Sequence, residues 1–348
     1  MFKEGIFMNR KELVLKTFHN EPTEKLLVGF WHHFLQDELV DGLHNPHYME
    51  ENLEGAKKFK EAFDPDFVKI MTDGLFFMPF NYEDIQCAAD LRNLKATEDM
   101  DLYFERTIQF VKDLRAIYGN DVLMYYSVFS PVFQINHRMD QTHPGKFNSE
   151  VEAPIAALLK EDPEATKAAM EMIGGYIERL LDVVVGEGLA DGTFFSVSTF
   201  NRGIEYDMYR KYVTPTEHRI IAKANSLAQD NLLHICGWRG MRNDLSIFLD
   251  YDFSVINWAV YAEHVSVAEG KKMFHNKCVI GGFGNNNTDL ICVGNKEDIQ
   301  NYVEQIVEEA GTTGVIIGAD CTIHLDTPYE HLYWVYEKAA EISERLLK

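Results

Sequence analysis

The feature that most constrains the fold is a regular alternation of short apolar runs with longer amphipathic stretches. The runs are rich in β-branched and aromatic residues, and they span 26–31, 66–71, 121–129, 192–197, 231–236, 253–259, 278–284 and 314–320. Between them, apolar residues recur at helical spacing opposite charged faces, most clearly over 98–119, 153–188 and 296–311. The nearly continuous apolar character of the runs indicates parallel strands covered on both faces. The pattern predicts a single (β/α)8 TIM barrel with an N-terminal helical extension, forming one domain over residues 1–348.

A doubly wound open sheet is the main alternative for a chain with this alternation. Sheets of that kind that bind dinucleotides carry G-x-G-x-x-G after the first strand, and this sequence has no such motif there. The Gly-Gly-Phe-Gly at 281–284 is too loosely spaced for a phosphate-binding loop. No internal repeat, low-complexity segment or Pro/Ser-rich linker divides the sequence. We therefore favour the barrel.

Charge and cysteine content argue against several classes of partner. A formal net charge of −22 with no basic run disfavours binding to nucleic acid or to anionic membrane surfaces. The sequence has no uncharged apolar run of membrane-spanning length, and its first residues lack the zones of a secretory signal. Five dispersed cysteines suit a reducing compartment better than a disulfide framework. We expect a cytoplasmic protein that acts on a small molecule or on another protein.

Two helix starts carry capping signals. The segments 214–217 and 327–330 have the sequences Thr-Pro-Thr-Glu and Thr-Pro-Tyr-Glu. A threonine at the N-cap, a proline at the first helical position and a glutamate three residues after the cap together form a capping box. The pattern predicts Thr214 and Thr327 as N-cap residues.

A histidine and two cysteines fall on the predicted catalytic rim. In NLLHICGWRG, residues 231–240, His234 and Cys236 are two positions apart and so point to the same side of an extended strand. Cys321 follows the eighth run, and the C-terminal ends of all strands share one rim of a barrel. One imidazole and two thiolates are suitable ligands for zinc. Because a lone cysteine or histidine at a strand end is more often a buried packing residue, the prediction depends on all three meeting.

Three ligands from distant strands indicate an open metal site. Structural zinc is closed by four protein ligands at close spacing, whereas three ligands leave a position for water or substrate. Two thiolates cancel the formal charge of Zn²⁺, which makes the ion a weak activator of water and a good host for a third sulfur. A substrate thiol bound there would lose its proton and remain nucleophilic. The ligand set therefore predicts thiol alkylation with one zinc ion per chain.

Three segments of the sequence carry a family resemblance. LLHICGWRGMRNDLSIFLDYDFSVINWA (232–259), VIIGADCTIHLDTPYEHLYWVYEKAAE (315–341) and MNRKELVLKTFHNEPTEKLLVGFW (8–31) resemble the uroporphyrinogen decarboxylase superfamily. Within it they resemble the corrinoid-dependent branch that includes the methylcobalamin:coenzyme M methyltransferases. The resemblance implies a (β/α)8 barrel. It also implies that an H-x-C pair and a later cysteine hold a zinc ion that binds the acceptor thiol, and these positions are matched by His234, Cys236 and Cys321.

The resemblance also implies the methyl donor. The reaction would move a methyl group between a protein-bound corrinoid (methylcobalamin) and a small thiol bound to zinc as the thiolate. A corrinoid-binding module carries D-x-H-x-x-G, and this sequence has no such motif, so we expect the corrinoid on a separate partner protein. The barrel mouth would then have an exposed apolar rim that includes Trp31, Phe34 and Trp238.

A cofactor-free decarboxylase of the uroporphyrinogen type is the alternative. The true decarboxylases hold their polyanionic substrate with an M-R-Q-A-G-R segment after the first strand and use an aspartate after the second. The corresponding GFWHHFLQDE (29–38) has no arginine, which disfavours a polyanion, although Asp73 matches the aspartate and is a candidate catalytic residue. A catalytically idle protein that binds metal or a corrinoid protein is a third possibility.

Several further residues are candidates for a fourth ligand or for a side chain that orients a ligand. Each is equally compatible with a solvated loop or with packing at the rim; they are His32, His33, Glu205, Tyr206, Asn257, Trp258 and Asp320. Arg239 and Arg242 follow the H-x-C strand. They are candidates for binding an anionic tail of the thiol or a corrinoid phosphate, or else are solvated charges.

Overall fold

Eight parallel strands form the central sheet, and each lies inside one of the predicted apolar runs. The computed structural model describes residues 9–147, 152–199, 203–237 and 240–347. The strands are β1 (Leu27–Gly29), β2 (Phe67–Ile70), β3 (Leu123–Phe129), β4 (Gly192–Val197), β5 (Leu232–Ile235), β6 (Val255–Trp258), β7 (Cys278–Phe283) and β8 (Val315–Ala319). All eight predicted strands are therefore confirmed.

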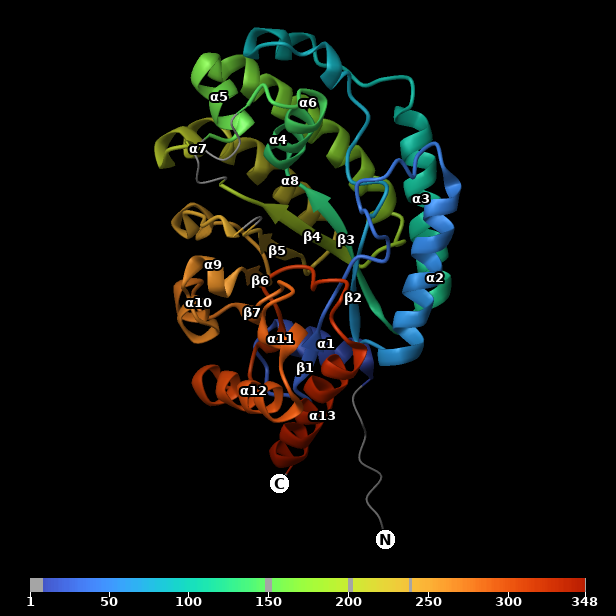
Figure 1. Ribbon diagram of the computed structural model, residues 1–348, viewed down its shortest axis with the longest axis vertical. Coiled ribbons are helices and arrows are strands. Elements are labelled where there is room, and N and C mark those ends of the chain that lie inside the picture. The colour runs from blue at the N-terminus through green and yellow to red at the C-terminus, as the bar shows by residue number, and fades with distance from the viewer. Residues whose placement is uncertain (1–8, 148–151, 200–202, 238–239, 348) are drawn as a thin grey trace.

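The sheet curves into a nearly closed barrel with the strand order β1-β8-β7-β6-β5-β4-β3-β2 (Figure 1). Every hydrogen-bonded pair of neighbouring strands is parallel. At the remaining seam, Gly29 of β1 faces the ring of Phe67 of β2, and a Cβ on Gly29 would lie 2.6 Å from Phe67 Cζ. A larger residue at position 29 would therefore displace the Phe67 ring. The predicted (β/α)8 barrel is confirmed, and the described strands do not have the order of a doubly wound sheet.

The helix α1 (Arg10–Phe18) covers the N-terminal end of the barrel and confirms the predicted helical extension. Its residues Leu13 and Phe18 belong to the same buried apolar cluster as the inward-facing Phe67 and Tyr125. The Phe18 ring centroid lies 5.8 Å from that of Phe67 and 5.7 Å from that of Tyr125. Because these contacts fill one end of the barrel, the interior is reached from the other end, where the strands terminate.

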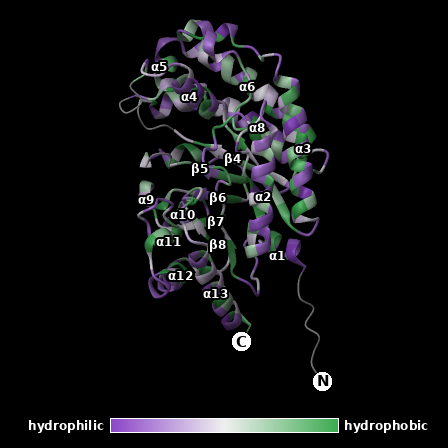
Figure 2. Ribbon diagram, turned by 45° about the vertical axis from the view of Figure 1, so that its right-hand side comes forward, coloured by the Kyte–Doolittle hydropathy of each residue, from purple (hydrophilic) through white to green (hydrophobic). Residues whose placement is uncertain are grey.

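Helices surround the sheet on its outer face (Figure 1). They are α2 (Pro46–Phe63), α3 (Met100–Tyr118), α4 (Pro131–Thr142), α5 (Pro154–Glu161), α6 (Pro163–Val184), α7 (Tyr206–Tyr212), α8 (Thr214–Leu227), α9 (Val260–Glu263), α10 (Val267–Met273), α11 (Leu290–Val293), α12 (Lys296–Ala310) and α13 (Tyr329–Leu346), with short 3-10 turns η1 (Tyr82–Asp84), η2 (Ala88–Asn93) and η4 (Leu245–Phe248). Figure 2 shows both hydrophilic and hydrophobic residues along these helices, as an amphipathic covering layer requires. None of the helices in the described ranges has the length and apolar content needed to cross a lipid bilayer.

Both predicted threonine caps are wrong. The helix α7 ends one residue before Val213, whose N–H still bonds to the carbonyl of Tyr209, so α8 begins at Thr214 with Val213 as its N-cap. At the second site Pro328 remains extended with ψ 134°, and α13 begins one residue later at Tyr329. The helix α8 therefore begins one residue before its predicted first position, and α13 begins one residue after its own.

Candidate metal centre

The three predicted ligands meet at the C-terminal end of the barrel. His234 lies in β5, Cys236 follows that strand directly, and Cys321 follows β8. One ligand atom from each residue lies within 4.8 Å of the others, and Cys321 Sγ is 3.3 Å from His234 Nε2. His234 and Cys236 are buried, and Cys321 is partly buried. The geometry that the sequence predicted for these residues is therefore present.

Asn257 in β6 determines which nitrogen of His234 faces the cysteines. Its side-chain amide donates to the carbonyl oxygens of Ile280 at 2.9 Å and Ala319 at 3.0 Å, which leaves its Oδ1 as an acceptor. That oxygen lies 2.5 Å from His234 Nδ1, so Nδ1 carries the proton and donates. Nε2 then keeps its lone pair toward Cys321, as a metal ligand must.

The thiol of Cys321 is placed to ionise. A hydrogen bond with Cys236 lowers the pKa of Cys321 well below its usual value, and His234 and Lys69 lower it further, although burial acts in the opposite direction. The thiolate is the form of cysteine that binds metals. The triad of His234, Cys236 and Cys321 therefore places an imidazole nitrogen close to a thiol of lowered pKa.

A buried network of hydrogen bonds positions Cys236, and no pattern in the sequence indicates it. The backbone N–H of Cys236 donates to the carbonyl of Val197 at 2.8 Å, and Asn243 donates to the carbonyl of Cys236 at 3.0 Å. The Asn243 amide also donates to Glu263 at 2.8 Å, while its oxygen accepts from the backbone N–H of Thr199 at 2.7 Å. The hydrogen bonds of Asn243 thus connect the ends of β4 and β5 to the end of α9.

A second residue that sequence reasoning missed is Lys69 of β2. Its side chain enters the barrel interior, where Nζ lies 5.0 Å from the ring centroid of Trp31 and 4.8 Å from that of Phe194. Burial lowers the pKa of Lys69, but negative charge on Cys321 and Cys236 favours its protonated form. The only sequence signal is its place between the inward-facing residues of a buried strand.

The candidate Asp73 lies behind the site and contacts the loop after β1. It is fully buried, and its carboxylate accepts hydrogen bonds from His33 Nδ1 at 2.8 Å and from the backbone N–H of Phe34 at 2.9 Å. Burial lowers the pKa of His33, but the hydrogen bond and charge of Asp73 outweigh it, so the net pKa is raised. In this arrangement Asp73 orients a histidine that faces the cavity.

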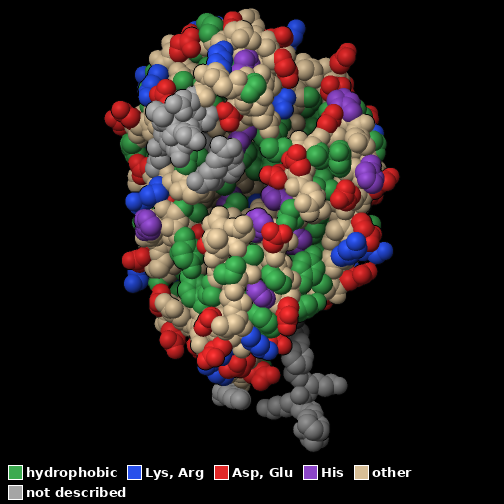
Figure 3. Space-filling view, viewed as in Figure 1, with side chains coloured by type: hydrophobic (Ala, Val, Ile, Leu, Met, Phe, Trp, Pro, Cys, Tyr) green, Lys and Arg blue, Asp and Glu red, His purple; other side chains and the backbone are tan. Residues whose placement is uncertain are grey.

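A cavity of about 370 Å³ opens beside the triad, close to the lower end of the range for small-molecule pockets. Its lining combines the triad with aromatic rings and few charges: His33, Glu38, Leu39, Lys69, Met71, Phe76, Phe77, Phe129, Phe133, His137, Ser196, His234, Cys236, Cys321 and Thr322. Figure 3 shows the surface hollowed near the centre of the view, with histidine and hydrophobic side chains around the hollow.

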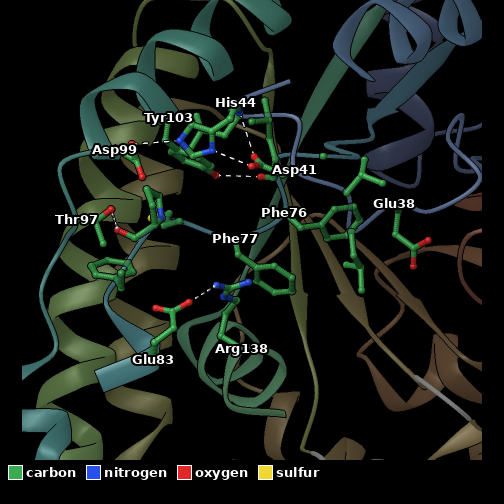
Figure 4. Close-up of a pocket in the computed structure, with 18 residues that line it drawn as sticks. Glu38, Asp41, His44, Phe76, Phe77, Glu83, Thr97, Asp99, Tyr103 and Arg138 are labelled. Atoms are coloured by element: carbon green, nitrogen blue, oxygen red, sulfur yellow. Dashed lines mark hydrogen bonds and ion pairs between the residues drawn. The ribbon is translucent and has the colours of Figure 1, made fainter. Parts of the chain in front are cut away.

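A second pocket of about 380 Å³ adjoins this cavity and is again near the lower end of the small-molecule range (Figure 4). Four residues line both: Glu38, Leu39, Phe76 and Phe77. On its far side His44 bridges two carboxylates, with Nδ1 2.8 Å from Asp41 and Nε2 3.3 Å from Asp99. Four carboxylates line this pocket, from Glu38, Asp41, Glu83 and Asp99, whereas Glu38 supplies the one carboxylate among the described lining residues of the cavity beside the triad.

The predicted exposed rim is wrong for Trp31. Trp31 is only 4% exposed, because it points into the barrel and packs against Phe194 with ring centroids 5.2 Å apart. Phe34 is partly buried against His32 and Phe59. Trp238 and Arg239 lie outside the described residues.

The remaining candidates have varied surroundings. His32 bonds with the Tyr329 hydroxyl at 3.1 Å, and Trp258 points outward and donates to the carbonyl of Val265. Glu205 and Tyr206 are exposed at the start of α7.

Two charged candidates, Arg242 and Asp320, lie within the described residues and have hydrogen-bond partners there. Arg242 donates to the carbonyl of Glu263 at 3.1 Å. Burial raises the pKa of Asp320 to about 8, and its carboxyl accepts from the backbone N–H of Tyr261 at 3.0 Å. Among the described residues, the group of potential ligands within 4.8 Å of one another consists of the predicted three, and neither of these side chains adds a fourth ligand atom.

Comparisons with known proteins identify a family and a shared architecture. The family model described as uroporphyrinogen decarboxylase (URO-D) matches residues 82–342. No curated protein matches the sequence. A methyltransferase from Methanosarcina mazei has a similar structure, with a TM-score of 0.70 and 15% identity over 96% of this chain and 99% of that chain. A B12-independent methionine synthase from Shewanella sp. W3-18-1 gives a TM-score of 0.56 at 10% identity over 93% and 99%. At these identities the structural similarity establishes the fold.

Proposed function

The chain belongs to the uroporphyrinogen decarboxylase family, and from this premise we propose that it is a zinc-dependent methyltransferase acting between a protein-bound methylcorrinoid and a small thiol. The observation that carries the proposal is the convergence of His234, Cys236 and Cys321 within 4.8 Å at the barrel mouth. The similar architecture of the Methanosarcina mazei methyltransferase supports the same reading.

The residues of the triad fit a zinc ion. They offer one imidazole nitrogen and two sulfurs, which is a donor set that zinc prefers. Asn257 keeps His234 Nε2 free to bind, and hydrogen bonding with Cys236 favours the thiolate of Cys321. When bound, zinc would lower the pKa of the acceptor thiol and keep it as a nucleophilic thiolate.

The residues around the triad have distinct tasks in the proposed reaction. Once the acceptor is bound against the aromatic lining, it displaces water from around its own sulfur, and Lys69 supplies positive charge near the sulfurs of Cys321 and Cys236. The acceptor sulfur forms the new S–CH₃ bond as the Co–C bond of the methylcorrinoid breaks. The electron pair of that bond stays on cobalt, and the thiol proton is released to solvent. The corrinoid would be presented by a separate protein at the barrel mouth.

The decarboxylase alternative has less support in the cavity. A porphyrinogen with several carboxylates needs several cationic partners, preferably arginines that bind in bidentate fashion. Among the described lining residues the cavity offers Lys69 as its only lysine or arginine, and Glu38 adds a negative charge. The cavity therefore suits a thiol with little negative charge better than a polyanion.

Elemental analysis of the purified protein tests the proposal. Prepared without chelators and supplied with Zn²⁺, the unmodified protein should hold about one equivalent, whereas Cys321→Ser should hold far less because it lacks one of three ligands. Cys292→Ser is the matched control, since Cys292 lies in α11 and outside the triad. An unmodified protein with well under one equivalent contradicts the proposal.

Turnover separates the three possible functions. The proposed enzyme should transfer the methyl group of methylcobalamin to a small thiol, and this activity should disappear in Cys321→Ser. Zinc binding without transfer to any thiol would favour an idle metal-binding protein. Release of CO₂ from a porphyrinogen by metal-free protein would favour the decarboxylase.

A further inference from the structure

Six rings form a continuous aromatic wall in the cavity beside the triad. The ring centroids of Phe76 and Phe129 lie 4.8 Å apart with an angle of 30° between the ring planes. Those of Phe129 and Phe133 lie 4.7 Å apart with an angle of 27°. The series continues to His137, whose centroid lies 4.0 Å from that of Phe133. All the rings line the cavity, and the wall consists of His33, Phe76, Phe77, Phe129, Phe133 and His137.

The wall and the triad come from different parts of the barrel. The rings belong to the segments after β1 and β2, to the end of β3 and to α4, whereas the triad belongs to β5 and β8. A thiol whose sulfur meets the triad therefore extends its remaining atoms toward the rings. Phe76, Phe77 and Phe129 are only partly buried, so an apolar occupant would cover ring surface that is otherwise open to water.

Polar groups that recognise an anionic tail are few in this cavity. Sulfonates, phosphates and carboxylates are usually bound by arginine or by clusters of backbone N–H groups. No arginine is found among the described lining residues, and the ammonium of Lys69 already lies against the rings of Trp31 and Phe194. Ser196 offers a buried hydroxyl that has no hydrogen-bond partner among the described residues, which suits a single polar atom.

The size of the cavity limits its occupant to a small molecule. Its volume of about 370 Å³ is near the lower end of the range for small-ligand pockets. A ring with a short thiol-bearing side chain fits such a space, whereas a corrin macrocycle does not and must remain at the mouth with its carrier protein.

We propose that the acceptor is an aryl or benzylic thiol whose ring packs against the aromatic wall while its sulfur meets the triad. This inference rests on the proposed function, because it assumes that the triad binds a thiol. It deepens that function by naming the class of acceptor. The preference arises because aromatic rings gain from offset stacking in addition to apolar burial.

Thiol binding to the Co²⁺-substituted protein tests the inference without turnover. The thiolate-to-cobalt absorbance would be titrated with benzyl mercaptan, ethanethiol and 2-mercaptoethanesulfonate. We expect benzyl mercaptan to bind at least about 10-fold more tightly than either of the others, as ring burial and stacking require. Equal or tighter binding of 2-mercaptoethanesulfonate overturns the inference but leaves the proposed function intact. If no thiol changes the spectrum, the proposed function fails and the inference with it.

Two substitutions examine the wall directly. Phe129→Leu should lower the affinity for benzyl mercaptan about 5-fold and leave the affinity for ethanethiol unchanged, because only the larger thiol reaches the ring. Phe76→Leu should behave in the same way and provides a second test if Phe129→Leu folds poorly. Phe104→Leu, in α3 outside the cavity, is the control and should change neither affinity. If Phe129→Leu and Phe76→Leu lower the affinity for benzyl mercaptan and for ethanethiol by the same factor, the rings have no specific role.

Discussion

His234 Nδ1 and Asn257 Oδ1 lie 2.5 Å apart, and this contact turns Nε2 of the histidine toward the two cysteines. We predict that Asn257→Leu weakens zinc binding by about 10- to 100-fold, the usual loss when the partner of a metal-binding histidine is removed. Competition with a chelator of known affinity would measure the change. Zinc affinity equal to that of the unmodified protein would contradict the role of Asn257.

Asn231→Leu provides the matched control for this prediction. Asn231 is also a buried asparagine; its Oδ1 accepts from the backbone N–H of Thr193 at 2.8 Å, but it precedes β5 at the opposite end of the barrel. Its replacement should lower the free energy of unfolding without changing zinc affinity. The pair of variants separates orientation of the ligand from general loss of stability.

Removal of the buried ammonium should weaken the proposed thiol binding. With two thiolates and a neutral imidazole, bound Zn²⁺ has no formal net charge, and a third thiolate adds one negative charge that Lys69 offsets. Lys69→Met keeps the apolar stem but loses the charge, so we predict about a 10-fold higher Kd for a simple alkyl thiol on the zinc-loaded protein. Isothermal titration calorimetry would measure it. Lys271→Met is the control, because Lys271 lies in α10 and bonds to the carbonyl of Gly314. Unchanged thiol affinity in Lys69→Met would argue against the charge effect.

The buried carboxyl of Glu217 should make folding stability depend on pH. Tyr209 donates to it at 3.1 Å and Tyr251 at 2.5 Å, yet burial dominates and raises the pKa of Glu217 to about 7 from 4.5. Between these two values the folded protein binds more protons than the unfolded chain, so the free energy of unfolding falls as pH rises. Glu217→Gln removes this dependence.

Urea unfolding at pH 5 and pH 8 would measure the effect of Glu217. From pH 5 to pH 8, the free energy of unfolding of the unmodified protein should fall by up to about 3 kcal/mol more than that of Glu217→Gln. A difference between the two proteins that is independent of pH would show that Glu217 titrates normally.

Two exposed leucines at the barrel mouth are expected to contact the proposed corrinoid protein. Leu39 is 46% exposed in the segment after β1, and Leu325 is 39% exposed in the segment after β8. We predict that Leu39→Asp and Leu325→Asp slow methyl transfer from a methylated corrinoid protein by about 10-fold or more, as loss of an apolar contact at an interface does. Transfer from free methylcobalamin should not change in Leu325→Asp, because Leu325 lies outside the cavity lining; Leu39 lines the cavity, so Leu39→Asp is expected to affect transfer from both donors.

Leu346→Asp is the control for these two substitutions, since Leu346 is 43% exposed at the end of α13. Leu346→Asp should change the rate of methyl transfer neither from the corrinoid protein nor from free methylcobalamin. If Leu325→Asp slows transfer from free methylcobalamin as much as transfer from the corrinoid protein, its effect does not arise from a protein contact and the prediction is wrong.

The barrel and the triad were predictable from the sequence because each follows from a local pattern and one geometric rule. Apolar runs located the strands, and the common rim of parallel strands brought Cys321 to the His234–Cys236 pair. Neither step needed knowledge of which side chains pack together. The function of the triad stays a prediction.

The surroundings of the triad could not be predicted because they depend on contacts between distant residues. Asn243 and Glu263 are joined by a hydrogen bond across 20 positions, and no local pattern marks either of them. Lys69 would ordinarily be assigned to a surface, and its burial depends on the rings of Trp31 and Phe194 and on the sulfurs of Cys321 and Cys236, which come from other strands. Trp31 follows the last residue of β1, so a place on the exposed rim is expected for it, but the alternation of β1 continues past the strand end and turns the ring into the barrel.

The separation of the ligands along the chain has a consequence for how the protein would acquire its metal. Two donors belong to β5 and the third follows β8, which pairs with β1. A growing polypeptide therefore cannot assemble all three donors until its last strand has emerged from the ribosome and docked beside its first. Loading of the ion would be a late event in biogenesis, and a chain that retains it would already have finished folding.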